Sequence, residues 1–222
     1  MMVLENVLTA QELASVRDFV KHAEFVDGKT TADAAIRNRK ANEQLKRDAG
    51  GALPVDQMVA QAFVRHSVFQ AWGMPMRMSI PLFNRYGEGM FYRQHVDSPV
   101  GNTNPPMRAD ISVTLFLSDP ADYEGGELVI ETPSGPTPVK LPAGFAFAYL
   151  TNALHSVNKI TRGERYAVVI WIQSTVPDDR LRAILFDLAF VEQSLAQTMN
   201  DSPTYNLLTK ARQNLVRLAA RM

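Results

Sequence analysis

Residues 125–136 read Gly-Gly-Glu-Leu-Val-Ile-Glu-Thr-Pro-Ser-Gly-Pro, a strand-length apolar run held between two turn signals. Glycine and proline clusters mark turns, and an apolar run of roughly four to eight residues between them is typical of a strand. Strand-length runs alternate with turn signals on both sides of this stretch as well. Further strand-length runs cover 76–86, 111–117, 139–141, 145–150 and 165–173. Short strands at this spacing predict an antiparallel sandwich or barrel.

The flanks of this β region have a different pattern. Between 76 and 176 no helix-length periodic segment interrupts the strands, which disfavours a parallel α/β sheet. We therefore expect a mainly β protein with flanking helices (α+β). The expected organisation is N-terminal helices over 1–75, a β core over 76–176 and a C-terminal helical annex over 177–222.

The helical flanks are predicted from capping and periodicity. Thr9 and Glu12 fit a capping box, and a second helix is expected near Pro54. The polar stretch 27–54 between them is interpreted as a loop with some short helix. The stripe expected to face inward on the last helix consists of Leu207, Leu208, Ala211, Leu215 and Leu218.

Composition excludes several classes of protein. The chain of 222 residues has no cysteine, which excludes disulfides, thiolate metal sites, cysteine-ligated iron–sulfur clusters and cysteine nucleophiles. Its 23 basic and 23 acidic residues balance, which argues against a nucleic-acid partner. The first residues do not read as a secretory leader, and no run approaches the roughly 18 apolar residues of a membrane helix. We expect a cytoplasmic protein without a membrane partner.

Three residues in the β region have the chemistry of a metal site. His95 and Asp97 are two positions apart, and such side chains on a strand point to the same face. His155 lies at the junction of two predicted strands and adds a second imidazole. Two histidines and one carboxylate suit ferrous iron with open positions for substrate and dioxygen. Taken singly, each residue also fits a surface pair or a hydrogen-bonded core histidine.

Arg165 and Tyr86 predict an anion beside this cluster. Arg165 opens an apolar strand, and a guanidinium that enters a buried strand needs an anionic partner, best a carboxylate. Tyr86 ends the strand that precedes His95, and its hydroxyl is in a position to reach the same anion. The sequence leaves two alternatives open: a salt bridge from Arg165 to Glu164 or to another acidic residue, and a boundary position for the tyrosine.

The order of these residues resembles the iron(II)- and 2-oxoglutarate-dependent dioxygenases, and more narrowly the prolyl-hydroxylase-like branch and the bacterial PKHD-type hydroxylases. The resemblance covers about residues 78–176. The stretches that carry it are 83–86, 89–97, 123–128, 154–157 and 161–174. The last of them, from Thr161-Arg162-Gly163-Glu164-Arg165 through Trp171-Ile172-Gln173-Ser174, is the most specific.

The resemblance implies a fold and a reaction. The fold is a double-stranded β-helix of the jelly-roll or cupin type, with two four-stranded sheets facing each other and iron at the open end. The reaction couples oxidative decarboxylation of 2-oxoglutarate to succinate with hydroxylation of a substrate. Fe(II), 2-oxoglutarate and dioxygen take part in this chemistry, and dependence on L-ascorbate (vitamin C) is common in the family.

The resemblance also implies roles for individual residues. His95, Asp97 and His155 would bind the iron. Arg165 would pair with the distal carboxylate of 2-oxoglutarate, and Tyr86 would donate a hydrogen bond to the same cosubstrate. Ser112 stands where related hydroxylases often place a small hydroxyl residue in that pocket.

Two positions depart from the family pattern. Arg93 stands where a small residue is expected, and Ser98 stands where asparagine is common, so both bear on the substrate edge rather than on the chemistry. The substrate is predicted only by class, as an iron-uptake or siderophore-related small molecule or as a peptidyl residue. The alternative function is a cupin-like metal-binding or sensing module that oxidises nothing. Such a module would have no use for Arg165 and Tyr86.

Overall fold

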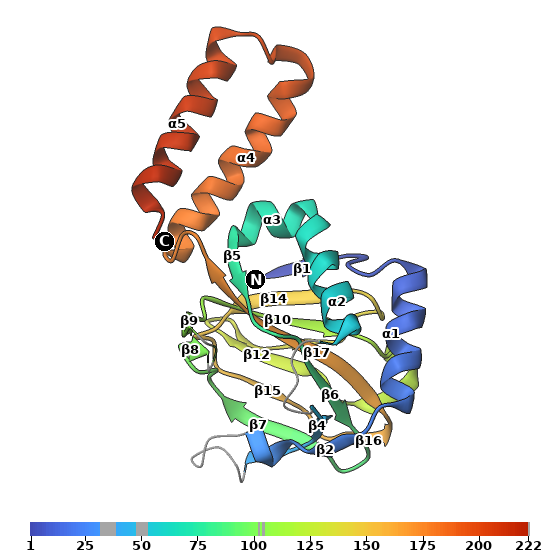
Figure 1. The fold of residues 1–222 in the computed structure, drawn as a ribbon. Helices are drawn as coiled ribbons and strands as arrows, with labels where there is room; N and C mark the ends of the chain where they lie inside the picture. The colour runs from blue at the N-terminus through green and yellow to red at the C-terminus, as the bar shows by residue number, and fades with distance from the viewer. Residues whose placement is uncertain (32–38, 48–52, 102, 104, 222) are drawn as a thin grey trace.

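The computed structural model describes residues 1–31, 39–47, 53–101, 103 and 105–221. Two β-sheets face each other, three helices cover the outer face of the larger sheet, and a helical hairpin projects from one end of the molecule (Figure 1). All the strand pairs are antiparallel in the part of the chain so described. The expectation of a mainly β protein with flanking helices is confirmed.

The larger sheet has eight strands in the order β1–β14–β10–β17–β6–β4–β2, with β5 also paired to β17. Its strands are β1 (Met2–Leu4), β2 (Phe25–Asp27), β4 (Glu43–Leu45), β5 (Pro75–Met78), β6 (Leu82–Tyr86), β10 (Ile111–Phe116), β14 (Ala146–Leu150) and β17 (Arg165–Ser174). The long predicted strand over 76–86 is thus two strands, β5 and β6, separated by residues 79–81.

The smaller sheet has five strands in the order β13–β12–β15–β7–β3. They are β3 (Lys40–Ala41), β7 (Phe91–His95), β12 (Leu128–Thr132), β13 (Gly135–Val139) and β15 (His155–Val157). Two short ribbons complete the β structure: β8 (Val100–Gly101) with β9 (Met107–Arg108), and β11 (Tyr123–Gly125) with β16 (Ile160–Gly163). Both sheets are larger than the four strands that the resemblance implies, because strands before β6 join each of them.

Strand alternation divides the larger sheet into an outer and an inner face. Ile111, Val113 and Leu115 of β10 pack in the main apolar cluster with the helices α1 (Ala10–His22), α2 (Pro54–Arg65) and α3 (Ser67–Gly73). Phe116, on the opposite face of the strand, packs instead with Leu128 of the smaller sheet. The polar side chains of the inner face are therefore held between the two sheets.

The N-terminal segment contains strands as well as helices, which corrects its prediction as helices joined by a loop. The capping box of Thr9 and Glu12 and the helix start at Pro54 are confirmed. The stretch 27–54, predicted as a loop, holds β3, β4 and the 3-10 turn η1 (Gly28–Thr31); residues 32–38 and 48–52 of that prediction lie outside the described residues. These strands turn polar side chains inward, so no alternation of apolar residues marks them.

The strand predicted over 139–141 lies earlier, as β13. The Thr132 hydroxyl donates to the Gly135 carbonyl oxygen at 2.7 Å and accepts from the Ser134 amide at 3.2 Å, which closes a tight turn. Gly135 has a φ of +106°, which a residue with a side chain rarely adopts. Pro136 and Pro138 are tolerated after it because β13 is an edge strand, where an absent N–H leaves no ladder bond unmade.

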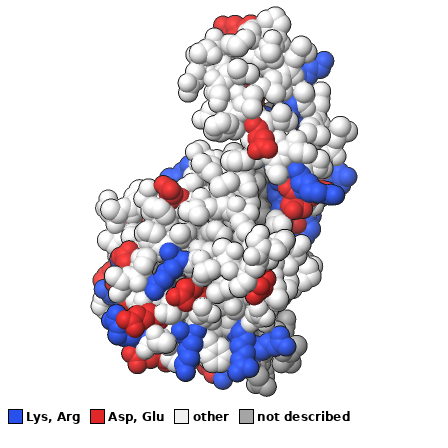
Figure 2. Space-filling view, turned by 180° about the vertical axis from the view of Figure 1, so that it is seen from behind, with Lys and Arg blue, Asp and Glu red and all other residues white. Residues whose placement is uncertain are grey.

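The C-terminal hairpin consists of α4 (Asp179–Met199) and α5 (Pro203–Ala219). Both of its ends meet the end of β17: the Arg182 guanidinium donates to the carbonyls of Val176 and Pro177, and the Arg221 amide donates to the Thr175 carbonyl at 2.9 Å. Figure 2 shows that the rear face of the hairpin carries few charged side chains, whereas charges gather over the body.

The predicted inward stripe of α5 is wrong at three of its positions. Leu215 packs against the cluster at the base of the hairpin, but Leu207 is 64% exposed and Leu218 75% exposed, and Ala211 is exposed too. The reason is that α5 packs mainly on α4, so its buried stripe is narrower than that of a helix lying on a sheet. Among the helices described, none is long and apolar enough to span a membrane.

Candidate metal centre

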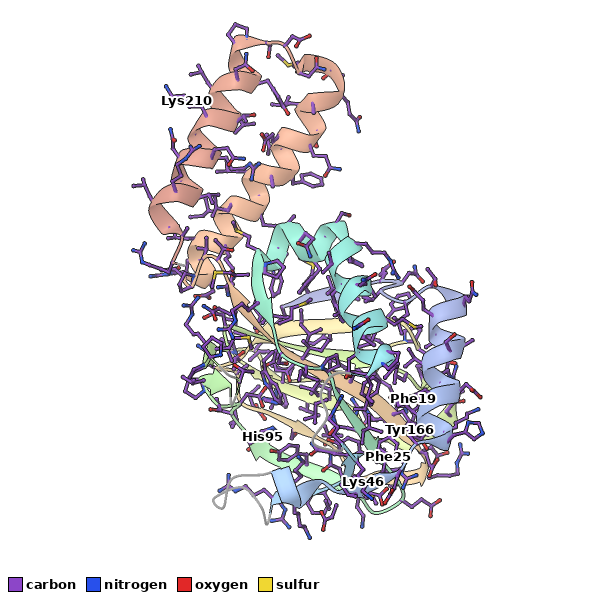
Figure 3. The ribbon with its side chains drawn as sticks, viewed as in Figure 1. Phe19, Phe25, Lys46, His95, Tyr166 and Lys210 are labelled. Carbon is purple, nitrogen blue, oxygen red and sulfur yellow. The ribbon has the colours of Figure 1, made fainter. Side chains whose placement is uncertain are left out.

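Neighbouring strands of the smaller sheet bring the predicted metal ligands together. β7 and β15 pair antiparallel, with His95 directly opposite His155, and Asp97 follows β7 by two residues. One donor atom of each of these three residues lies within 4.8 Å of the other two. His95 lies in the body of the molecule, far from the projecting hairpin (Figure 3). The structure therefore assembles in space what the sequence presents as two separate motifs.

Backbone carbonyls fix both imidazoles in the form that can bind a metal. The His95 Nδ1 lies 2.9 Å from the Arg93 carbonyl, and the His155 Nδ1 lies 3.0 Å from the Ala153 carbonyl. A carbonyl oxygen only accepts, so each Nδ1 carries a proton, and Nε2 is the ring atom that can offer a lone pair to a metal. Both Nε2 atoms lie 3.8 Å from an oxygen of Asp97. Three lone-pair donors thus converge on one point, which suits a cation.

Burial keeps the site ready for a metal. His95 and His155 are 6% and 4% exposed. Burial, followed by repulsion from His155, lowers the pKa of His95 to about 4, so this imidazole is neutral near pH 7. Two imidazoles and one carboxylate are the ligand set of the facial triad that binds ferrous iron. The residues present therefore fit Fe(II).

Ser112 lies beside the predicted metal ligand Asp97. Its hydroxyl donates to Asp97 Oδ2 at 2.7 Å and lies 3.1 Å from the Thr151 hydroxyl. Ser112 is fully buried on the inner face of β10. This contact orients the carboxylate, which is the usual part of a residue behind a metal ligand. A contact between Ser112 and 2-oxoglutarate stays a prediction.

Arg165 is a buried cation without an acidic partner in the part of the chain that the structure describes. The residue is 2% exposed, and its Nε and Nη2 atoms form no hydrogen bond there. The alternative pairing with Glu164 is not formed, and the Glu164 carboxylate instead accepts from the Tyr166 hydroxyl at 3.1 Å. A buried guanidinium with free donors indicates a binding site for an anion.

Three aromatic residues surround this guanidinium. The Arg165 Cζ lies 5.3 Å from the ring centroids of both Tyr86 and Phe116, and Tyr86 is directly opposite Arg165 in the β6–β17 register. Burial raises the pKa of Tyr86 to about 12, so its hydroxyl stays protonated and can donate. Burial also raises the pKa of Tyr123, whose buried hydroxyl lacks a partner among the described atoms. These donors face the anion pocket together.

The metal centre and the anion pocket share one interior. Asp97 and Arg165 both act electrostatically on Tyr86 and on Tyr149, so both charges are near the same two side chains. Tyr149 also packs edge-on against His155, with ring centroids 5.0 Å apart. A ligand with a chelating group at one end and a carboxylate at the other matches this arrangement. All six residues predicted from the sequence line this interior.

Tyr92 is a pocket residue that the sequence analysis does not single out. Its ring stacks on His95 with centroids 3.6 Å apart and planes at 13°. The register shifts between His155 and Val157 because β7 has one extra residue there, which brings Tyr92 and His95 to the same face although they are three residues apart. A period-two pattern cannot predict that contact.

Comparisons with known proteins agree with this geometry. Residues 81–173 match the 2OG-Fe(II) oxygenase superfamily. The chain is 42% identical over 224 residues to a PKHD-type hydroxylase of Methylobacterium nodulans, and the alignment covers 98% of this chain and 97% of that protein.

Solved structures share the fold at lower identity. A prolyl-4-hydroxylase of Pseudomonas putida superposes with a TM-score of 0.58 and 22% identity, covering 78% of this chain and 91% of that one. HygX of Streptomyces hygroscopicus, whose structure holds nickel and 2-oxoglutarate, gives a TM-score of 0.56 and 15% identity over 78% of this chain and 82% of that one. The superposed proteins have the double-stranded β-helix fold, as this chain does.

Proposed function

We propose roles for the residues of the pocket from the premise that this chain belongs to the PKHD-type hydroxylases, within the 2OG-Fe(II) oxygenase superfamily. It is an Fe(II)- and 2-oxoglutarate-dependent dioxygenase that couples oxidation of the cosubstrate to hydroxylation of a substrate. Family membership decides against a cupin-like module that oxidises nothing. The observation that carries the residue assignment is the convergence of three donor atoms within 4.8 Å, in one interior with an unpaired buried arginine.

His95, Asp97 and His155 would hold the iron through Nε2, a carboxylate oxygen and Nε2. Bound iron supplies dioxygen activation, the chemistry that no amino-acid side chain provides. The chain's own contribution is geometric: the carbonyls of Arg93 and Ala153 keep each imidazole turned, and burial excludes competing protons. No general base or nucleophile of the protein is required for this reaction.

Arg165 would bind the distal carboxylate of 2-oxoglutarate, and Tyr86 would donate to the same group. A carboxylate would accept hydrogen bonds from the free N–H groups of the guanidinium. The pair would be strong because the pocket is buried and both partners are charged. The hydroxyl of Tyr86 supports the same anion as a neutral donor because its pKa lies far above neutrality. Ser112 would act mainly through Asp97, which it holds in place.

The substrate is proposed by class. The related Pseudomonas putida protein is a prolyl-4-hydroxylase, which favours a peptidyl residue. An iron-chelating small molecule of the siderophore type is the second class. It ranks below a peptidyl residue because no described contact of the pocket favours it. Ascorbate is proposed as a reductant that keeps the iron ferrous between turnovers. A nucleic-acid partner is not proposed, because the chain has zero formal net charge, and the proposed location is the cytoplasm.

Succinate release tests this function. Purified protein with Fe(II), 2-oxoglutarate and ascorbate is screened against proline-containing peptides and against siderophores, with and without a chelator of iron. We expect iron-dependent succinate formation that one substrate class stimulates. Stimulation by siderophores alone would reverse the order of the two classes. Succinate formation that survives complete removal of iron would contradict the assignment of the metal centre.

A further inference from the structure

Lys40 is a buried lysine close to the predicted metal ligands, and the roles proposed above do not involve it. The residue is only 5% exposed. Within the residues that the structure describes, no carboxylate forms an ion pair with its ammonium group. A buried ammonium without a counter-ion is costly, and a bound anion beside it would offset that cost.

The strand β3 turns Lys40 into the pocket. Lys40 is directly opposite Tyr92 in the β3–β7 register, and opposite residues of an antiparallel pair share a face. Its Nζ lies 5.3 Å from the centroid of the Tyr92 ring. Because that ring stacks on His95 at 3.6 Å, Lys40 and a predicted iron ligand contact the same aromatic side chain.

The residues that follow Lys40 line the same interior. Asn42 and Gln44 alternate with Ala41 and Glu43, and both are buried. Their amides donate to the Asn84 Oδ1 at 2.9 Å and 3.1 Å. Asn42 also acts on the hydroxyl of Tyr86, the predicted 2-oxoglutarate contact. The stretch 40–44 is therefore a wall of the cosubstrate pocket rather than a surface loop.

Electrostatics places Lys40 at the metal end of this pocket. The charged groups that act on it are Asp27 and Asp97, and it acts in turn on His95. Arg165 is not among the groups that act on it. Burial lowers the pKa of Lys40 to about 8 in spite of the two carboxylates, so near pH 7 it is a cation that no carboxylate of the described residues pairs with.

We propose that Lys40 is a second cation of the 2-oxoglutarate site: its ammonium binds the carboxylate next to the keto group, while Arg165 binds the distal carboxylate. This inference rests on the proposed function. The proposal also places a ligand contact in the N-terminal segment. That segment lies outside residues 81–173, the part of the chain that matches the superfamily. The two ends of one dicarboxylate would then be held by cations from the two different sheets.

Calorimetric titration of 2-oxoglutarate into the iron(II)-loaded protein, without oxygen, tests the proposal. The variants are Lys40→Met, which removes the charge but keeps the stem, and Lys40→Gln, which keeps a polar tip. Lys21→Met removes one exposed charge from α1 and is the matched control. We expect both Lys40 variants to raise Kd by about ten- to a hundredfold, the size of a charge-assisted pair, and the control to leave it unchanged.

Pyruvate, which has the keto-acid end but no distal carboxylate, identifies the end that Lys40 holds. Lys40→Met should weaken pyruvate and 2-oxoglutarate by the same factor, whereas Arg165→Met should weaken only 2-oxoglutarate. Weakening of 2-oxoglutarate with unchanged pyruvate binding would overturn the assignment to the keto-acid end. An unchanged Kd for 2-oxoglutarate in both Lys40 variants would overturn the proposal altogether.

Thermal unfolding separates ligand binding from a structural role. Removal of an unpaired buried charge should raise the Tm of the ligand-free protein and reduce the gain in Tm on adding 2-oxoglutarate. A large fall in the Tm of ligand-free Lys40→Met and Lys40→Gln would instead make Lys40 a structural residue. Failure of the proposed function is distinguishable from either outcome, because the wild-type protein would then not bind 2-oxoglutarate at all.

Discussion

The metal end and the anion end of the pocket differ in how their polar groups are satisfied. At the metal end, each imidazole has a backbone carbonyl behind it, and Ser112 holds Asp97. At the anion end, the Nε and Nη2 atoms of Arg165 and the hydroxyl of Tyr123 are buried without partners among the described residues. The polar groups of one end are thus satisfied by the chain itself, whereas those of the other would be satisfied by a bound ligand.

This difference predicts how each end responds to substitution. A change at the metal end removes a group that the fold has already oriented, so the loss falls on metal affinity. A change at the anion end removes a charge that costs the ligand-free protein stability and that a bound carboxylate would neutralise. The two kinds of variant should therefore separate metal binding from cosubstrate binding.

The largest effect is expected for Asp97→Ala. Loss of the only carboxylate of the triad should lower iron affinity by about a hundredfold or more and abolish succinate formation, because even residues behind a ligand contribute about ten- to a hundredfold. Iron binding is measured by titration under anaerobic conditions, with the exposed Asp201→Ala as control. Wild-type iron affinity in Asp97→Ala would show that the metal lies elsewhere.

The next effect is expected for Arg165→Met. Kd for 2-oxoglutarate should rise by about ten- to a hundredfold, while iron affinity stays at the wild-type value. The ligand-free variant should be at least as stable as the wild type, because a buried charge without a partner is removed. Titration calorimetry and thermal unfolding measure the two quantities. Equal losses of iron and 2-oxoglutarate binding would remove the distinction between the two ends.

Ser112→Ala should have a smaller effect, confined to the metal end. Without the 2.7 Å hydrogen bond to Asp97, iron affinity should fall by about tenfold, and 2-oxoglutarate binding at saturating iron should change little. Both constants are obtained from the same two titrations. A rise in Kd for 2-oxoglutarate with normal iron affinity would instead support a direct contact of Ser112 with the cosubstrate.

Tyr86→Phe should have the smallest effect, confined to the anion end. The substitution removes one neutral hydroxyl donor and keeps the ring against Arg165, so a loss of about 1 kcal/mol, or roughly fivefold in Kd for 2-oxoglutarate, is expected. The pKa of about 12 means that this contribution should not vary between pH 6 and pH 9. A strong pH dependence that Tyr86→Phe abolishes would contradict a neutral donor role.

The sequence predicted the pocket better than it predicted its walls. His95, Asp97 and His155 lie in motifs with a fixed order. That order can be identified in the sequence without knowing how the chain runs between the motifs. Lys40 and Asn42 have no such motif. They are polar residues on inward positions, so the rule that buried strands are apolar assigns them to a loop.

The hairpin shows a second limit of sequence reasoning. The helices over 177–222 were expected and are present, but the register of α5 was predicted as if a broad surface covered it. Leu218 is 75% exposed because only the narrow face toward α4 is buried. Periodicity fixes which residues share a face of a helix, not how wide the neighbouring surface is.

The hydrogen bond from the Arg221 amide to the Thr175 carbonyl has a mechanical consequence for the hairpin. The hairpin leaves the core after β17 and is hydrogen-bonded back to the same place, so its far end lies away from both sheets (Figure 1). A full helical turn inserted into both α4 and α5 would lengthen the hairpin by about 5.4 Å without displacing any strand. Its reach can therefore vary independently of the pocket.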